Sequence, residues 1–178
     1  HGIRKGIFNI NVVPIMAGSA LQNKGVINLM NEIVKYLPEA AERAAQPATD
    51  LAKDTVVGIQ CSPDGPFAAQ VFKTAVDPFV GKMNYLRVVR GCLKPGMSVL
   101  NPNTGTTERI SAVYLIRGKK LEPLTELGAG DIGAVSKLTN TGTGDTLCDE
   151  NAPVMFDPIA FHKPVLFMAV YASARGTE

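Results

Sequence analysis

The stretch that decides the fold is residues 67–90, which read FAAQVFKTAVDPFVGKMNYLRVVR. Two runs rich in apolar, aromatic and β-branched residues, 67–76 and 82–90, lie on either side of the turn signal Asp77-Pro78. Runs of this length that are divided by such a signal predict antiparallel strands. Antiparallel β structure is therefore expected at the centre of the chain.

The same pattern continues beyond this stretch. Short β-like runs separated by glycine, proline, asparagine and aspartate occupy residues 97–101, 108–116 and 131–138. We therefore expect a mainly β unit over residues 55–151, built as a small barrel or a sandwich. A small closed antiparallel β-barrel is favoured, because closure removes the exposed edges that an open sheet must protect.

A different pattern precedes this β unit. Residues 11–17 form a nearly continuous apolar run, which is typical of a strand covered on both faces, and Gly18-Ser19-Ala20 ends it. From Val26 to Leu37, apolar residues recur at three-and-four spacing, which predicts a helix with one apolar stripe. Strand, small-residue turn and helix make half of an α/β unit. Residues 1–37 are therefore expected to be the incomplete end, a strand-helix remnant, of an α/β domain.

Two further segments flank the predicted β unit. Residues 38–54 are rich in alanine and polar residues and contain Pro38 and Pro47, which predicts a linker. Residues 152–178 are expected to hold a connector and the first strand of a further domain, because an apolar stretch runs from Pro164 to Tyr171.

The composition excludes several classes of protein. The 178 residues are 46% hydrophobic and 19% charged, which fits a folded globular protein. The net charge of +2 is too weak to indicate nucleic-acid or acidic-lipid binding by itself. No apolar run approaches the roughly 18 residues that a membrane helix needs, and no signal-peptide pattern opens the chain. We therefore expect a cytoplasmic protein with no membrane partner.

Patterns for catalysis and metal binding are weak. The three cysteines are far apart and form no Cys-x-x-Cys pair, and the sequence has two histidines. No metal site and no pairing of a nucleophile with a histidine follows from them. We interpret Asp145, Asp149 and Glu150 as turn formers rather than metal ligands. The segment is expected to have no catalytic residue and no metal site of its own.

Positive charge is concentrated in residues 71–94, which contain five cations and one acid. Clustered cations position a protein on phosphate groups without reading sequence, which predicts contact with RNA. A solvated strand edge protected by lysine is the second interpretation, and both stay open. The cations are Lys73, Lys82, Arg87, Arg90 and Lys94, and the acid is Asp77.

Strand alternation predicts where the two arginines of this segment point. Arg87 should lie beside Tyr85, on the face opposite Leu86 and Val88. Arg90 should then point to the face opposite Arg87 unless a β-bulge intervenes.

Three blocks, taken in order along nearly the whole chain, resemble the elongation factor G family of ribosomal translocation GTPases. The first block contains Ile3-Arg4-Lys5-Gly6, residues 13–20, Asn23-Lys24-Gly25-Val26 and Tyr36-Leu37-Pro38. The second contains Phe67-Ala68-Ala69, Phe72-Lys73, residues 77–82 and Arg87-Val88. The third contains Ala129-Gly130-Asp131-Ile132 and residues 143–149.

The resemblance implies a role for each predicted part. Residues 1–37 would end the GTPase domain, residues 55–151 would form the β-barrel second domain (translation-factor domain II type), and residues 152–178 would begin the third. The barrel would couple the GTPase domain to the ribosome through small-subunit ribosomal RNA. The residues expected to bind RNA are Lys73, Lys82, Arg87 and Lys94.

The resemblance also implies a place for the nucleotide in the longer parent protein. Ser19 would shape the turn on the guanine side of the site, and the amide of Ala20 would approach the guanine oxygen. Without the resemblance, these residues are a plain strand-to-helix turn. The sequence lacks the phosphate-binding Gly-x-x-x-x-Gly-Lys-Ser/Thr loop and the Asp-x-x-Gly and Asn-Lys-x-Asp motifs. GTP or GDP with Mg²⁺ is therefore expected in the parent, and no cofactor is expected in this segment.

Alternatives to a translocation GTPase stay open. Residues 117–121 and 171–176 depart from the commonest pattern of the family, which keeps open a binding barrel of a related translational GTPase, of the release or ribosome-protection type. A free-standing enzyme is disfavoured by the missing motifs. The apolar residues of the GTPase-domain remnant are expected to pack on the barrel, fray, or make a homotypic contact; they are Val12, Val13, Ile15, Val26, Leu29 and Ile33.

Overall fold

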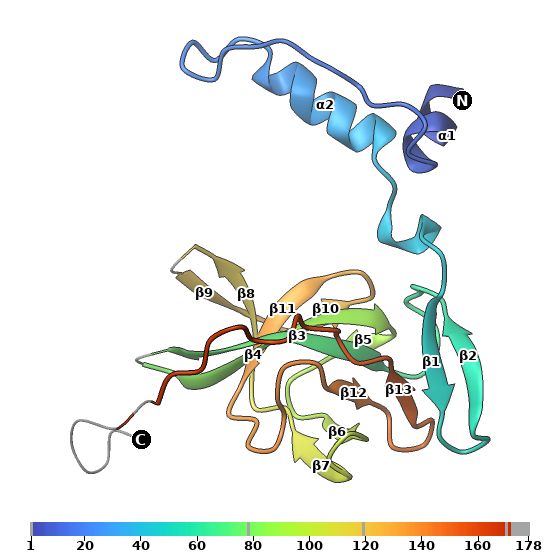
Figure 1. Ribbon diagram of the computed structural model, residues 1–178, viewed down its shortest axis with the longest axis vertical. Helices are drawn as coiled ribbons and strands as arrows, with labels where there is room; N and C mark the ends of the chain where they lie inside the picture. Colours follow the sequence, from blue (N-terminus) through green and yellow to red (C-terminus); the bar gives the residue numbers. More distant parts are fainter. Residues whose placement is uncertain (1, 78, 119, 170, 172–178) are drawn as a thin grey trace.

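The computed structural model describes residues 2–77, 79–118, 120–169 and 171 (Figure 1). The N-terminal part contains two helices, α1 (Gly2–Phe8) and α2 (Val26–Tyr36). A short 3₁₀ turn, η1 (Ala40–Glu42), leads from them to the strands. In Figure 1 the two helices lie at one end of the molecule and the strands at the other, with η1 between them.

The rest of the described chain is built from short strands. They are β1 (Gln46–Asp50), β2 (Thr55–Ile59), β3 (Ala68–Asp77), β4 (Gly81–Arg90), β5 (Cys92–Leu93), β6 (Ser98–Asn101), β7 (Thr106–Arg109), β8 (Val113–Arg117), β9 (Lys120–Leu124), β10 (Leu127–Gly128), β11 (Ile132–Ser136), β12 (Thr146–Cys148) and β13 (Val154–Phe156). The expectation of a mainly β chain with few helices is confirmed.

Three groups of strands account for the hydrogen-bonded pairing. Eight strands form one sheet in the order β7-β6-β12-β3-β4-β11-β8-β9, while β5 pairs with β10, and β1 lies between β13 and β2. Every pair of strands within these groups is antiparallel. β7 and β9 are the end strands of the large sheet, and the pairs formed by the described residues do not join them into a ring.

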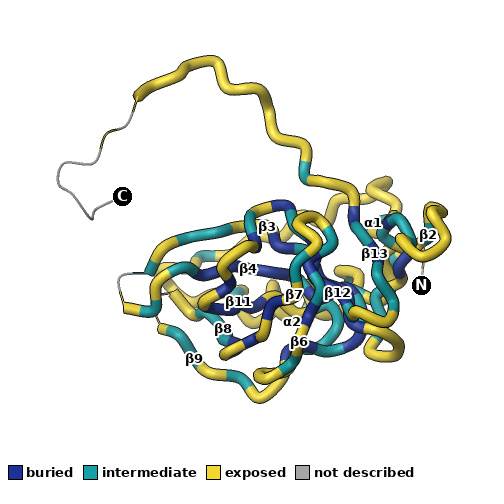
Figure 2. Tube along the Cα trace, turned by 90° about the horizontal axis from the view of Figure 1, so that it is seen from below, coloured by how far each residue is buried: buried dark blue, intermediate teal, exposed yellow. Residues whose placement is uncertain are grey.

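One hydrophobic core lies on the inner face of the large sheet. Side chains from eight different strands meet in it, and Figure 2 shows the dark-blue buried positions gathered along β4, β11 and β12. Each large apolar side chain buried there contributes about 1.5–3 kcal/mol relative to an exposed one. The core residues are Phe67, Ala69, Val71, Leu86, Val88, Leu93, Val99, Ile110, Val113, Leu127, Val135, Leu138 and Leu147.

A second cluster holds the three-stranded sheet against the outer face of the large sheet. Ala48, Ile59 and Phe156 come from the small sheet, and Val89 and other residues come from β3, β4 and β12. The small sheet therefore packs on the outside of the large one.

The face prediction for β4 is confirmed. Leu86 and Val88 lie in the inner core, whereas Val89 lies in the outer cluster. Ala68 is paired with Arg90 and Ala69 with Val88, so Val89 is the extra residue of a β-bulge, which changes the face of the side chain that follows it. Arg90 lines a cavity against the small sheet, with Val57 and Val154, and therefore turns to the outer side as well.

The N-terminal part departs from the expected strand and helix. Helix α2 forms, but residues 12–17 are extended without strand pairing, so the strand predicted at residues 11–17 is wrong for this chain. A strand needs a neighbour for its backbone hydrogen bonds, and no described residue provides one beside this segment. Neither α1 nor α2 buries any residue, and the apolar stripe of α2 faces solvent. Helix α1 was not predicted.

Two strands lie in segments that were expected to be connectors. β1 falls within residues 38–54, and β13 falls within residues 152–178, and the two pair with each other. The described residues between 164 and 171 form no strand. Most of the predicted tail at 171–176 lies outside the described residues, as do Pro78 of the turn signal and Lys119 of the 117–121 connection. Across the described residues, no helix combines the length and apolar character required to cross a bilayer.

Candidate functional site

Lys73 lies beside the ring of Tyr85 on the outer face of the large sheet. Alternation from the buried Val71 would point Lys73 inward, but the register shifts between Val71 and Lys73, so that Phe72 is the extra residue of a bulge. Lys73 is thereby paired with Tyr85, and its Nζ lies 5.2 Å from the centre of the ring. A cation over an aromatic face at an exposed site contributes about 0.5–1 kcal/mol. The bulge at Phe72 thus places Lys73 on the same face of the sheet as Tyr85.

A second tyrosine extends this surface across the sheet. Tyr85 is paired with Ala134 of β11, and Ala134 is paired with Tyr114 of β8. Both tyrosines are half-buried, and the small Ala134 between them is fully buried. Lys73, Tyr85 and Tyr114 therefore belong to one row across four strands, which we call the cation–aromatic row. Sequence reasoning missed Tyr114, although the alternation within residues 108–116 carried the signal.

Lys82 and Lys94 already have partners. The Nζ of Lys82 donates a hydrogen bond to the backbone oxygen of Thr139 at 3.1 Å. The Nζ of Lys94 lies 3.1 Å from Oε2 of Glu126, and both side chains are exposed. The hydrogen bond with Glu126 raises the pKa of Lys94, and the charges of Glu126 and Cys92 add to this effect. The Lys94 charge is locally balanced.

Arg87 lines a cavity and does not belong to the cation–aromatic row. A hollow of about 320 Å³ lies between residues 40–45, the connector ahead of β1, and the strands β1, β2 and β4, and Arg43 and Arg87 both line it. We call it the joint cavity. The four cations predicted to bind RNA therefore form no single patch: Lys73 is in the row, Arg87 in the joint cavity, and Lys82 and Lys94 in local contacts.

The predicted guanine-side turn forms a closed loop ahead of α2. Ser19 and Lys24 exchange two backbone hydrogen bonds, of 3.0 and 2.9 Å, and the Oγ of Ser19 accepts from the amide of Gln22 at 3.3 Å. A Cβ at Gly18 would stand 2.9 Å from the oxygen of Lys24, so this close approach requires glycine. Ser19 and Ala20 line a hollow of about 240 Å³ with the start of α2.

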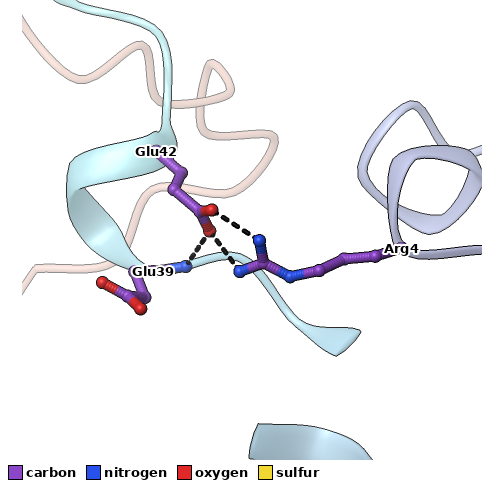
Figure 3. A network of polar contacts seen from close by, with 3 residues as sticks. All are labelled: Arg4, Glu39 and Glu42. Carbon is purple, nitrogen blue, oxygen red and sulfur yellow. Dashed lines mark hydrogen bonds and ion pairs between the residues drawn. The ribbon is translucent and has the colours of Figure 1, made fainter. Parts of the chain in front are cut away.

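Polar contacts tie the helices to the strands through η1 (Figure 3). Arg4 of α1 makes a bidentate pair with Glu42, whose carboxylate also accepts from the backbone N–H of Glu39 at 2.9 Å. The hydrogen bonds from Arg4 and, next, from the Glu39 amide lower the pKa of Glu42. Beyond η1, the side-chain amide of Gln60 donates to the oxygens of Ala41 and Arg43, at 2.7 and 2.9 Å.

Asp145 acts as a turn former, as expected. Its Oδ2 accepts from the amide of Gly142 at 2.8 Å and from the side chain of Asn101 at 3.0 Å. Across the described ranges, no group of three or more histidine, cysteine or acidic residues is placed to hold a metal ion.

Comparison with known proteins places this chain in a family. Residues 66–150 match the family model described as elongation factor G domain 2. The chain is 38% identical over 172 residues to an elongation factor G of Karelsulcia muelleri (strain GWSS), a match that covers 94% of this chain and 24% of the relative. It is 37% identical over 174 residues to an elongation factor G of Chlamydia trachomatis serovar D, a match that covers 98% of this chain and 25% of the relative.

A solved structure agrees with the sequence relatives. A crystal structure of a protein from Thermus thermophilus matches with a TM-score of 0.63 and 30% identity, over 85% of this chain and 20% of that one. The chain spans about a quarter of the length of the curated relatives that it matches. The resemblance of the three sequence blocks is confirmed. The chain belongs to the elongation factor G family.

Proposed function

We propose that this chain is part of a ribosomal translocation GTPase and that its β unit couples the GTPase domain to small-subunit ribosomal RNA. The family supports the translational role. The observation that carries the RNA contact is the cation–aromatic row, in which Lys73 lies over Tyr85 and Tyr114 follows across the sheet. A lysine can contact phosphates without reading sequence, and a tyrosine ring can stack on an unpaired base.

The β unit would act as a closed barrel of the translation-factor domain II type. The support for closure is the inner core, to which eight strands contribute side chains, including β6 and β8, which lie next to the end strands of the large sheet, and the β5–β10 pair. A rigid body of this kind suits transmission, because a well-packed core moves as a unit. The joint between η1 and the strands would pass on a movement of the GTPase domain.

The other predicted cations would contribute unequally. Lys82 is close to the tip of the β3–β4 hairpin, where its contact with a backbone oxygen leaves the charge uncompensated by an acid in the described part. Lys94 would have to exchange Glu126 for a phosphate, which lowers the net gain. Lys73 should therefore contribute most to RNA binding, followed by Lys82 and then Lys94.

GTP or GDP with Mg²⁺ would bind in the whole protein, and this chain would supply one side of the site. The turn at Ser19 and Ala20 is small and ordered by backbone hydrogen bonds, which suits the approach of a guanine oxygen to the Ala20 amide. The phosphate and Mg²⁺ ligands are not found in this sequence. The turn could therefore orient a base but could not hold a triphosphate.

Binding to purified small ribosomal subunits, measured on filters at rising salt, tests the RNA contact. Binding should weaken as salt rises, and Lys73→Glu should weaken it further and reduce the salt slope by about one. Lys163→Glu changes the same charge at an exposed position in the C-terminal segment and is the matched control. Binding that is indifferent to salt, or equal loss with Lys163→Glu, would contradict the proposal.

A further inference from the structure

The joint cavity has the size and the wall chemistry of a small-ligand site. Its volume of about 320 Å³ is at the lower end of the roughly 300–1,000 Å³ typical of such sites. Pro47 of β1, Ile59 of β2 and Val89 of β4 supply apolar side chains to its lining, and Arg43 and Arg87 are its two charged lining residues. No aspartate or glutamate is among the described residues that line it.

Both guanidinium groups have donors to spare. An arginine side chain carries five N–H donors and no acceptor. Within the described part of the chain, the side chains of Arg43 and Arg87 make no hydrogen bond or ion pair, whereas Arg4 pairs with Glu42 and Arg117 with Glu122. Two positive charges that line the same cavity repel each other, and an anion between them offsets this repulsion. The charge of the cavity is therefore complementary to an anion.

The connector is held in place around the cavity. The Cβ that Gly130 lacks would stand 2.8 Å from the Cβ of Ala40, and that of Gly58 would stand 3.0 Å from the Cβ of Ala45. The connector approaches the strands closely at both points because glycine leaves room there. Gln60 fixes the backbone oxygen of Arg43. A wall that is already in position loses little entropy when a ligand binds, which favours affinity.

We propose that the joint cavity binds a phosphate ester, with Arg43 and Arg87 as the two cationic groups. Arginine forks match phosphate geometry and form short, charge-assisted hydrogen bonds. The apolar walls would receive the sugar or base that carries the phosphate. Two sources share this chemistry: a free nucleotide and the backbone of RNA. The site goes beyond the proposed function, because it lies where the helices join the strands and does not use the cation–aromatic row.

Cys61 offers a direct reporter of occupancy. It lines the joint cavity and is half-buried, whereas Cys92 is equally half-buried but lies outside it. The neutral reagent iodoacetamide should therefore label Cys61 more slowly when pyrophosphate, GDP or a ten-residue oligoribonucleotide is bound, while labelling of Cys92 should not change. Mass spectrometry of the peptides from the full chain measures both rates in one sample. Protection by the oligonucleotide alone assigns the RNA backbone, protection by GDP assigns a free nucleotide, and protection by pyrophosphate shows that phosphate groups suffice for binding.

Three variants make the test specific. Arg43 is exposed, so Arg43→Gln should fold normally and should weaken protection of Cys61 about tenfold, as expected for the loss of a hydrogen bond to a charged group. Arg87→Gln should act in the same direction, and Lys73→Gln should leave protection unchanged. Equal labelling of Cys61 with and without all three ligands, or undiminished protection in Arg43→Gln, would overturn the site. The cation–aromatic row is tested separately by ribosome binding of Lys73→Glu, so either idea can fail while the other stands.

Discussion

Arg4 and Glu42 form a two-point contact between α1 and η1, with Nη1–Oε1 and Nη2–Oε2 distances of 2.7 Å each. The same carboxylate accepts from the Glu39 amide at 2.9 Å, and the Glu42 amide donates to the backbone oxygen of Glu39 at 3.2 Å. One acid therefore both closes the 3₁₀ turn and holds the N-terminal helix to it (Figure 3). Because α1 and α2 bury no residue, few other contacts can fix their position relative to the strands.

Arg4→Gln should loosen α1 without unfolding the strands. An exposed ion pair contributes little to the stability of a fold, and the hydrophobic cores contain no residue of α1. Hydrogen–deuterium exchange should accelerate in residues 2–8 and 39–43, while the melting temperature of the β unit should stay unchanged. Lys24→Gln removes a charge from the loop ahead of α2 and serves as the control. Unchanged exchange in residues 2–8 would show that other contacts position the helix.

The same contact should be sensitive to acid. The pKa of Glu42 lies below its ordinary value of 4.5, chiefly because Arg4 donates to the carboxylate. A group whose pKa is lowered by folding stabilises the folded form above its ordinary pKa, and the stabilisation is lost as pH falls through the lowered value. The Arg4–Glu42 contact should therefore persist at neutral pH and break only below the ordinary range of a glutamate.

Nuclear magnetic resonance can follow the Glu42 carboxyl carbon through an acid titration. In Arg4→Gln the midpoint should move up towards 4.5. A Glu42 midpoint that is the same in both proteins would mean that Arg4 does not hold the carboxylate in solution.

The β3–β4 hairpin could be read from the sequence because its signals are local. The runs 67–76 and 82–90 became Ala68–Asp77 and Gly81–Arg90, within a residue at each end. The small sheet could not be read in this way. β1 is QPATD, which has low strand propensity, and it pairs with β13 about a hundred residues later. The small sheet forms because Ala48 and Phe156 are buried against the outer face of the large sheet, and no local sequence pattern indicates this burial.

The candidate site was predictable in composition but not in geometry. The excess of cations in residues 71–94 was visible, yet the face on which Lys73 lies depends on a bulge at Phe72. A bulge reverses alternation for every later residue of its strand, and nothing in the run 67–76 marks its position. Arg87 was placed on the correct face, but the connector that lines a cavity beside it was expected to be only a linker.

Gly130→Ala should destabilise the joint. Gly130 has φ +90°, where a side chain is strained, and its new Cβ would stand 2.8 Å from that of Ala40. Denaturant unfolding should show a loss of about 1–3 kcal/mol from the strained backbone, plus a contribution from the clash. Gly96→Ala separates the two effects, since Gly96 has φ +89° but no atom within 4 Å of a new Cβ.

A double substitution checks the assignment of the clash. Ala40→Gly removes the opposing Cβ, so Gly130→Ala combined with Ala40→Gly should recover the part of the loss that exceeds the loss in Gly96→Ala. Coupling between two residues in contact is typically about 0.5–3 kcal/mol. Additive losses in the pair would show that η1 does not press on Gly130 in solution.

Glu108 of β7 should contribute strongly to the stability of the β unit. Its carboxylate is buried and accepts from the backbone N–H of Thr139, from that of Asn140 at 3.1 Å, and from the hydroxyl of Thr141 at 2.6 Å. Glu108→Ala would leave these donors without their acceptor, and each hydrogen bond to a charged group contributes about 1.5–3 kcal/mol. Denaturant unfolding should show a loss of several kcal/mol in the free energy of unfolding, and Glu108→Gln should lose less because one oxygen remains.

Glu122→Ala, which removes an exposed acid paired with Arg117, is the control and should cost less than about 1 kcal/mol. If the two alanine variants were equally stable, the loop at residues 139–141 would have to be held by the neighbouring Asn101 and Asp145 contacts instead.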